Sequence, residues 1–319
     1  MKAIVQDRYG PPEVLRIEDV EQPVPADDEV LIRVRASTVS QTDVHIRGGH
    51  PWPWRLVAGF RRPRWGWLGV EFAGIVEAVG SAVEELHVGD EVFGSRWFGI
   101  HAEFLCMRAT GVVALKPASL SFEEAAAIYD GGSQALATLR KAGAEPGRRL
   151  LIYGASGSLG SAAVQIAKHF GAHVTAVCGT DHVELVWSLG ADDVIDYRRQ
   201  DFRKNGQTYD AIIDAVGKYA FRWGRRSIRP GGVYVATDVG PRPLESLLAP
   251  LATRWIGSRR MTFASGRRSR DDAMLLKDLV ERGAYRPVID RVYSMHEVVD
   301  AHRRVEAWHK TGNVVLTIG

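Results

Sequence analysis

One segment restricts the possible folds of this 319-residue chain more than any other: a glycine-rich loop between an apolar run and a helix-like stretch. It begins at Arg148 and reads RRLLIYGASGSLGSAAVQIAKHFGAHVTAVC. Glycine suits such a loop because the turn is tight, the backbone must approach a pyrophosphate, and the helix must pack close to the sheet. Within a strand–loop–helix–strand unit of about 30 residues, this spacing predicts dinucleotide binding at the helix N-terminus. The predicted cofactor contacts in the loop are Gly154, Ala155, Ser156, Gly157, Ser158, Leu159 and Gly160.

The pattern of apolar residues along the chain changes near residue 118. After it, apolar runs such as LLIY, HVTAVC and YDAIIDAV alternate with helical stretches, which predicts a parallel sheet covered on both faces, an α/β doubly wound fold. Before it, short β-forming runs between glycine, proline and aspartate predict a β-rich, barrel-like unit. Apolar spacing predicts helices at 271–283 and 297–308, and NVVLTI a closing strand. The length of the chain also favours two domains.

The end of the second strand of the nucleotide unit indicates which dinucleotide is preferred. An acidic side chain there would bind the ribose hydroxyls of NAD, but this strand ends in Val177, Cys178 and Gly179. NADP(H) is therefore favoured over NAD(H). Asp181 argues the other way, because a carboxylate repels a 2′-phosphate. The predicted contacts at this end are Cys178, Thr180, His182 and Tyr197.

Composition excludes several functional classes. The formal net charge of +3 is divided among short arginine clusters and forms no continuous basic stripe, so no nucleic-acid partner is expected. No apolar run reaches the roughly 18 residues that would cross a bilayer, and the start MKAIVQDRYG lacks the apolar core of a signal peptide. We therefore expect a cytoplasmic protein without a membrane partner. With two cysteines, Cys106 and Cys178, neither a disulfide framework nor a multi-cysteine zinc site can form.

Several motifs occur in an order that resembles one family across essentially the whole chain. They include VLIRVRASTVSQTDVHIRGG, LGVEFAGIVEAVG, VGDEVFG, EPGRRLLIYGASGSLG, SLGADDVIDY and GNVVL. The family is the medium-chain dehydrogenase/reductase superfamily, in its zinc-free quinone-oxidoreductase-like branch. The resemblance implies a GroES-like catalytic domain from 1–118 and 266–319, and a Rossmann dinucleotide-binding domain from 119–265. It also adds Val216 and Gly217, in IIDAVG, to the cofactor contacts.

The resemblance allows the possibility of zinc to be tested at each ligand position. Zinc-containing members have a cysteine at the position of Ser40, a histidine at Val70, and a third ligand near Asp130. A tetrahedral catalytic site needs three protein ligands and a water, and serine and valine cannot replace thiolate and imidazole. The sequence therefore predicts no zinc. GVEFAG, residues 69–74, is predicted to be a barrel turn in which Glu71 acts as a hydrogen-bonding acid.

The missing metal narrows the predicted chemistry. Oxidation of a simple alcohol needs a metal or a base to stabilise the alkoxide. A quinone or an enone instead delocalises the charge over its own conjugated oxygen. The sequence predicts an NAD(P)H-dependent reductase of a small quinone or α,β-unsaturated carbonyl. A zinc-free NAD(P)-dependent alcohol dehydrogenase and a non-catalytic NADP(H)-binding redox-sensing module stay open as alternatives.

Candidate catalytic residues follow from where the family has its active site, between the barrel and the nucleotide domain. Ser40, Asp43 and Tyr129 are the candidates, although the family usually has Asn-Pro where this chain has Ser40 and Gln41. Packing of Tyr129 with its hydroxyl in water is an equal alternative. The loop 50–68 either lines a pocket for a flat substrate or covers the barrel or an oligomer interface, and we expect a homodimer. Its tryptophans are Trp52, Trp54, Trp65 and Trp67.

Overall fold

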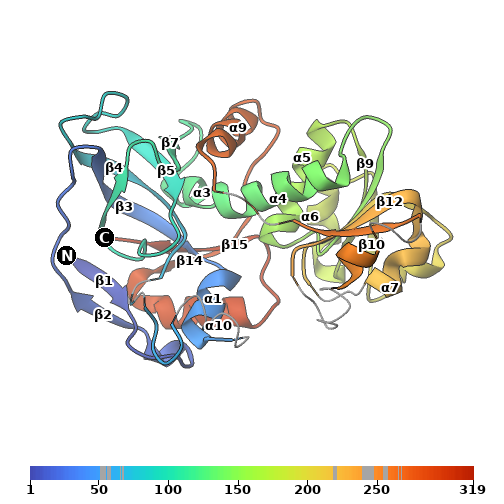
Figure 1. Cartoon of the computed structure of the whole chain (residues 1–319), viewed down its shortest axis with the longest axis horizontal. Coiled ribbons are helices and arrows are strands. Elements are labelled where there is room, and N and C mark those ends of the chain that lie inside the picture. Colours follow the sequence, from blue (N-terminus) through green and yellow to red (C-terminus); the bar gives the residue numbers. More distant parts are fainter. Residues whose placement is uncertain are drawn as a thin grey trace. The chain divides into compact units, whose positions relative to one another are not determined.

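The structure, a computed structural model, describes two compact units of the chain (Figure 1). One unit contains Met1–Asp130, Arg268–Glu281 and Arg286–Gly319, and the other contains Gly131–Arg267 and Arg282–Tyr285. The four tryptophans of the loop 50–68 lie outside the described residues. Those residues are 1–50, 55, 59–64, 66, 68–217, 221–238, 248–253, 258–264, 266 and 268–319.

The unit that begins at Gly131 contains a parallel sheet. Its strands are β8 (Arg149–Tyr153), β9 (His173–Cys178), β10 (Asp193–Asp196), β11 (Tyr209–Asp214), β12 (Ile228–Ala236) and β13 (Arg260–Phe263). Among the described residues they lie in the order β10-β9-β8-β11-β12-β13, and every neighbouring pair is parallel. This is the strand order of the doubly wound dinucleotide-binding fold. The predicted α/β class is confirmed.

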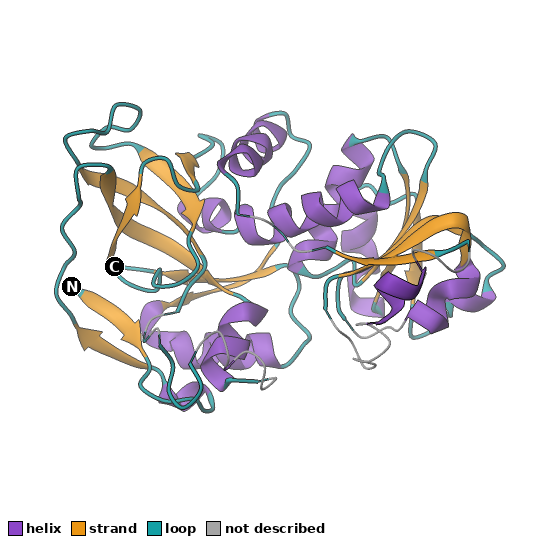
Figure 2. Ribbon diagram, viewed as in Figure 1, coloured by secondary structure: helices purple, strands orange, loops and turns teal. Residues whose placement is uncertain are grey.

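Burial on both faces explains the apolar strands of this sheet. Leu151 and Ile212 are at most 1% exposed and share a core with Tyr234. Figure 2 shows helices flanking the strands, as the alternating sequence pattern predicts. The helices are α4 (Tyr129–Ala142), which starts in the other unit, α5 (Ser158–His169), α6 (Val183–Ser188) and α7 (Phe221–Gly224). Short 3₁₀ turns lie at Thr180–His182, Phe202–Lys204 and Arg225–Ser227.

The other unit is the predicted β-rich barrel domain. Its larger sheet, as far as the chain is described, has the order β14-β15-β3-β4-β5-β7, with β6 paired to β3. The strands are β3 (Glu29–Val39), β4 (Glu71–Val79), β5 (Glu91–Ser95), β6 (Phe104–Arg108), β7 (Val113–Leu115), β14 (Ile289–Ser294) and β15 (Asn313–Thr317), and a separate pair is formed by β1 (Lys2–Val5) and β2 (Arg16–Asp19). The helices are α1 (Gln41–Gly48), α3 (Phe122–Ala126), α9 (Arg270–Glu281) and α10 (Val298–Glu306), with 3₁₀ turns at Pro12–Val14 and Met295–Glu297.

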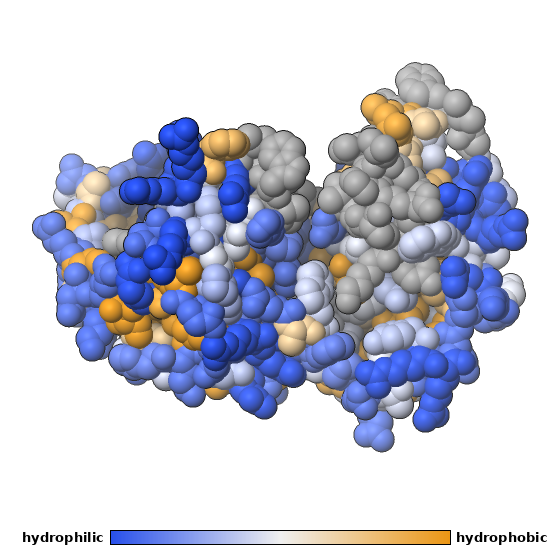
Figure 3. Space-filling model, turned by 90° about the horizontal axis from the view of Figure 1, so that it is seen from below, coloured by the Kyte–Doolittle hydropathy of each residue, from blue (hydrophilic) through white to orange (hydrophobic). Residues whose placement is uncertain are grey.

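The predicted C-terminal elements are confirmed. Helices α9 and α10 correspond to the amphipathic segments 271–283 and 297–308, and β15 to the closing strand. In the part of the chain that the structure describes, no helix is long and apolar enough to cross a membrane. Figure 3 shows a face on which hydrophilic side chains prevail and hydrophobic ones form small groups.

Strand direction brings distant residues of the barrel unit to one end of its sheet. β3 is antiparallel to both β4 and β15, with Ser37 opposite Phe72 and Val39 opposite Val314. The carboxyl end of β3 therefore lies beside the amino ends of β4 and β15. This places Ser40, which follows β3, at the same end as the first residues of β4.

Candidate active site

The three glycines of the loop after β8 have three different geometric roles. Gly154 has φ +86°, a left-handed conformation that favours glycine, and a Cβ there would lie 2.1 Å from Val216 Cγ2. A Cβ on Gly160 would lie 2.1 Å from the Gly154 carbonyl oxygen, so the helix packs against the loop. A Cβ on Gly157 would meet nothing closer than that carbonyl oxygen, at 3.6 Å. The space beside Gly157 is the space that a pyrophosphate needs.

The loop leads directly into α5. Gly157 is the N-cap of this helix and makes no side-chain capping bond, so the amides of Ser158, Leu159 and Gly160 form the first turn. Ala155 N donates to Val177 O at 3.0 Å, which anchors the loop to β9. Ser156 lies between these anchors. The residues fit a dinucleotide pyrophosphate, because a helix N-terminus combines unbonded amides with a positive dipole end.

A loop after β11 completes this edge of the sheet. Asp214 Oδ1 accepts hydrogen bonds from Val216 N at 3.1 Å and Gly217 N at 3.0 Å, and Tyr234 Oη donates to Asp214 Oδ2 at 2.9 Å. Gly217 has φ +70°. The structure thus brings Val216 against Gly154, although 62 residues separate them in the numbering. Sequence reasoning missed Asp214, whose signal was an acid at the end of an otherwise apolar strand.

A second missed acid lies at the ribose end. Cys178 ends β9 and is paired in register with Asp196, which ends β10. Thr180 Oγ1 donates to Asp196 Oδ2 at 2.7 Å, and this bond is the main reason that the pKa of Asp196 lies below its usual range. The motif DVIDY contained the signal, because parallel neighbours end at the same sheet edge. The prediction that no acid lies there considered only the second strand.

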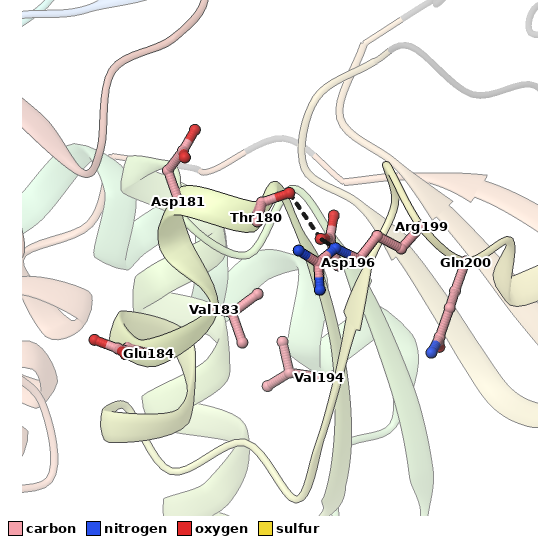
Figure 4. Close-up of a pocket in the computed structure, with 8 residues that line it drawn as sticks. All are labelled: Thr180, Asp181, Val183, Glu184, Val194, Asp196, Arg199 and Gln200. Carbon is pink, nitrogen blue, oxygen red and sulfur yellow. Dashed lines mark hydrogen bonds and ion pairs between the residues drawn. The ribbon is translucent and has the colours of Figure 1, made fainter.

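A cavity of about 510 Å³ lies beside this pair of strand ends (Figure 4). Asp181 Oδ2 lies 3.4 Å from Arg198 Nη1, so a cation partly offsets the charge that disfavours a phosphate. Tyr197 Oη would be 3.4 Å from a Cβ on Gly179, and His182 ends the 3₁₀ turn that begins at Thr180. The lining residues are Thr180, Asp181, Val183, Glu184, Val194, Asp196, Arg199 and Gln200.

In the barrel unit, Ser40 and Asp43 are bonded to each other. They form a reciprocal capping box at the start of α1, in which Ser40 Oγ donates to Asp43 Oδ2 at 2.7 Å. The other oxygen of Asp43 accepts from Gly69 N at 2.9 Å. Asp43 is fully buried. Two of the three predicted catalytic residues, Ser40 and Asp43, therefore shape the turn between β3, α1 and the GVEFAG segment.

Glu71 is the hydrogen-bonding acid that the sequence predicts. Its carboxylate accepts from Thr38 Oγ1 and from Asp130 N, both at 2.6 Å. Burial, and next the nearby Asp130 carboxylate, raise the pKa of Glu71 to about 8. Burial also raises the pKa of Asp130. Two buried carboxyl groups that repel each other favour a state in which at least one holds a proton.

The donor set at the zinc positions does not fit a tetrahedral zinc site. Val70 is 1% exposed and its side chain has no donor atom. The hydroxyl of Ser40 is committed to Asp43, as both donor and acceptor. Of the three positions, only Asp130 has a side chain that commonly binds zinc, whereas a catalytic site needs three such ligands.

Tyr129 is held by a neighbouring backbone segment. Its hydroxyl accepts from Ser269 N at 2.7 Å and donates to Ser269 O at 3.2 Å, so it is bonded to protein rather than left to solvent. Burial raises its pKa to about 12. Two cations missed by sequence reasoning belong to this unit: Arg268, whose pKa burial lowers, and Lys310, whose pKa burial lowers to about 8. In the sequence, Arg268 belongs to one of the short arginine clusters and was given no role in the site, and no pattern marked Lys310.

Comparison with known proteins identifies relatives along the whole chain. Residues 26–141 match the alcohol dehydrogenase GroES-like domain, and residues 189–316 match the zinc-binding dehydrogenase family. A 2-methylene-furan-3-one reductase from Solanum lycopersicum is 33% identical over 99% of this chain and 79% of its own length. An NADPH-dependent alkenal/one oxidoreductase from Arabidopsis thaliana, a chloroplast protein, is 31% identical over 99% and 79%. The structure of the quinone oxidoreductase from Coxiella burnetii superimposes with a TM-score of 0.88 at 28% identity, covering 100% and 99% of the two chains.

Proposed function

Because the chain belongs to the medium-chain dehydrogenase/reductase superfamily, we propose that it is a zinc-independent NAD(P)H-dependent reductase of small quinones or α,β-unsaturated carbonyls. The observation that carries the proposal is the glycine loop, in which Gly157 leaves space beside the first turn of α5. The names of the relatives support a conjugated acceptor. Two of the zinc-ligand positions support chemistry without zinc. Val70 has no donor atom in its side chain, and the hydroxyl of Ser40 is bonded to Asp43.

The residues of the chain have separate tasks in this reaction. When bound, the dinucleotide supplies the hydride. The first turn of α5 binds the pyrophosphate, and Asp214 keeps Val216 and Gly217 in the turn beside it. The ribose of the dinucleotide is bound by four residues at the ends of β9 and β10: Cys178, Thr180, His182 and Tyr197. A conjugated acceptor takes hydride at its β-carbon and spreads the new charge onto its oxygen, so the protein has mainly to orient both molecules.

A substrate panel tests this proposal. Oxidation of NADPH and NADH is followed at their absorbance with quinones and enones, and the reverse reaction with ethanol-like alcohols. We expect conjugated acceptors to react at least a hundredfold faster in kcat/KM. With a C4-deuterated cofactor and an enone, deuterium should be found at the β-carbon. Deuterium at the carbonyl carbon, or efficient turnover of simple alcohols, would favour the zinc-free alcohol dehydrogenase instead. Tight NADPH binding without any turnover would favour the redox-sensing module.

Zinc content provides an independent prediction. The purified protein should contain well under one zinc per chain by elemental analysis, because Val70 offers no ligand atom. Its activity should not change after dialysis against EDTA. Stoichiometric zinc together with loss of activity on chelation would contradict zinc independence.

Cofactor preference follows from the charges at the ribose end. We expect NADPH to be preferred although Asp196 lies at this end, because Thr180 binds its carboxylate and a relative is named NADPH-dependent. Asp181→Arg should raise the preference over NADH roughly tenfold or more, because a charge-assisted bond to phosphate contributes about 1.5–3 kcal/mol. The change also releases Arg198 from its ion pair with Asp181. Asp193→Arg, at the opposite end of β10, is the control and should have no effect. A wild type that uses NADH better, with no gain in the arginine variant, would refute this ribose pocket.

Localisation and assembly stay predictions for this chain. We propose a cytoplasmic homodimer that acts on a small molecule. Fractionation and light scattering would test the two statements separately.

A further inference from the structure

Three contacts hold Arg268 in place, all within the barrel unit. Its Nε donates to Ser95 Oγ at 2.9 Å, and its guanidinium carbon lies 3.9 Å from the ring centroid of Trp97. The next residue, Ser269, is bonded through both its backbone N and its backbone O to the hydroxyl of Tyr129. An arginine side chain is flexible, and it loses rotamer freedom when it is held in one geometry. Much of that freedom is already lost before any ligand binds.

The anchor behind Arg268 reaches the metal position of the zinc-containing relatives. Ser95 Oγ accepts from Arg268 and donates to Val70 O at 2.6 Å. Ser95 and Val70 are 3% and 1% exposed. Ser95 is the last residue of β5 and is paired with Glu71, the first residue of β4, which directly follows Val70. One buried hydroxyl therefore connects the guanidinium to the backbone of the residue that replaces the zinc-ligand histidine.

The terminal nitrogens of Arg268 have no bonding partner among the described residues. Arginine has five N–H donors, and beyond Nε those of Arg268 form no hydrogen bond or ion pair with any residue that the structure describes. Trp97, on which the guanidinium stacks, is 59% exposed, and Arg268 itself is partly buried. Arg47 in the same unit is different: its guanidinium bonds to Gly10 O, His302 and Glu306. Arg47 therefore has a structural role. Arg268 differs, because its Nε is bonded to Ser95 while its two terminal nitrogens have no partner among the described residues.

The surroundings keep Arg268 charged. Burial lowers its pKa, and nearby acidic groups, Asp130 first, oppose this change. An arginine keeps its proton in such a setting. Partial burial also weakens solvent screening, so a fixed cation there acts more strongly on a ligand oxygen than it would in water.

We infer that the terminal nitrogens of Arg268 bind the carbonyl oxygen of the acceptor and stabilise the negative charge which that oxygen gains during reduction. This inference rests on the proposed function, because it assigns a catalytic residue to the same reaction. Hydride adds to the β-carbon and forms a C–H bond there, while the π electrons move to give an enolate. The nicotinamide is oxidised, the acceptor is reduced, and a proton from water at the α-carbon completes the product. The guanidinium has the electrophilic role that zinc has in other members, and Tyr129 holds the backbone beside it.

Two substitutions at Arg268 distinguish the effect of its positive charge from the effect of its planar guanidinium geometry. Arg268→Met should lower kcat/KM for an enone by about 10²–10³-fold, the usual cost of removing one oxyanion donor. Arg268→Lys keeps the charge but not the planar pair of terminal nitrogens. Its kcat/KM should therefore stay below a tenth of the wild-type value. The Kd for NADPH should stay within twofold in both. Arg270→Met, which removes the ion pair of a neighbouring arginine with Glu85, is the matched control and should change kcat/KM less than threefold.

A binding measurement tests the same site without turnover. Crotonate is a poor hydride acceptor because its carboxylate is already charged, yet it presents an oxygen where an enone would. Calorimetric titration of the NADP-loaded protein should show crotonate binding that weakens at least tenfold in Arg268→Met and is unchanged in Arg270→Met. Tyr129→Phe should weaken it less, and should add nothing in the Arg268→Met background, because both changes act through one group.

The outcomes distinguish the inference from the proposed function. Enone reduction that survives Arg268→Met, or full activity in Arg268→Lys, overturns the role of Arg268 while the reductase stands. Crotonate binding that is absent or indifferent to Arg268 also overturns it. If the wild type reduces no conjugated acceptor but crotonate binding depends on Arg268, the oxyanion site stands and the proposed reaction is wrong.

Discussion

Replacing Gly157 with valine should abolish cofactor binding and leave the fold intact. Gly157 has φ −78° and ψ 176°, an extended conformation that valine adopts readily, and an added Cβ would meet no protein atom closer than 3.6 Å. The protein therefore tolerates the side chain, but the pyrophosphate cannot approach the amides of α5. We expect the Kd for NADPH, measured by fluorescence titration, to rise at least a hundredfold.

A second glycine provides the control for this prediction. A Cβ on Gly160 would lie 2.1 Å from Gly154 O, so Gly160→Ala should destabilise the unit by about 1–3 kcal/mol through overpacking. Thermal unfolding should thus report a lower Tm for Gly160→Ala and a nearly unchanged Tm for Gly157→Val. Unchanged NADPH affinity in Gly157→Val would show that the cofactor binds elsewhere.

Stability should fall as pH rises from about 5 to 8, because Glu71 is buried with a raised pKa. The folded state holds a proton up to a pKa of about 8, whereas an unfolded glutamate loses it near 4.5. Below the unfolded value the contribution is fully present, and it is lost as pH rises through the folded value. At its steepest the free energy of unfolding should change by about 1.4 kcal/mol per pH unit. Chemical unfolding at several pH values measures it.

Glu71→Gln is the test variant for this pH dependence. Glutamine is neutral at every pH, so the slope between pH 5 and 8 should become much smaller. Glu77→Gln, an exposed glutamate on the same strand, should keep the slope of the wild type. A wild type whose stability is flat over this range would show that Glu71 is ionised in the folded protein.

The local parts of this protein follow from its sequence because their causes are local. The alternation of apolar runs and helical stretches predicted the parallel sheet, and apolar spacing predicted α9 and α10. Glycine spacing after β8 predicted a loop whose three glycines differ in geometry. Ser40 and Asp43, three residues apart, also had the spacing of a capping box. Their chemistry was predicted to be catalytic, although this local signal indicated a helix start.

Contacts between residues that are far apart in the sequence could be found only in the tertiary structure. Asp196 contacts Thr180 because parallel strands end at one edge of the sheet, although Asp196 belongs to the third strand and not the second. Ser95 and Arg268 are 173 residues apart, and Tyr129 and Ser269 are 140 apart. No periodicity relates positions so distant, since their contact depends on how strands pair and on which side chains burial brings together. The sequence alone therefore determined the glycine loop that we propose as the cofactor site. The packed barrel unit decided which hydroxyls are bonded within the structure and which guanidinium has terminal nitrogens without a partner among the described residues.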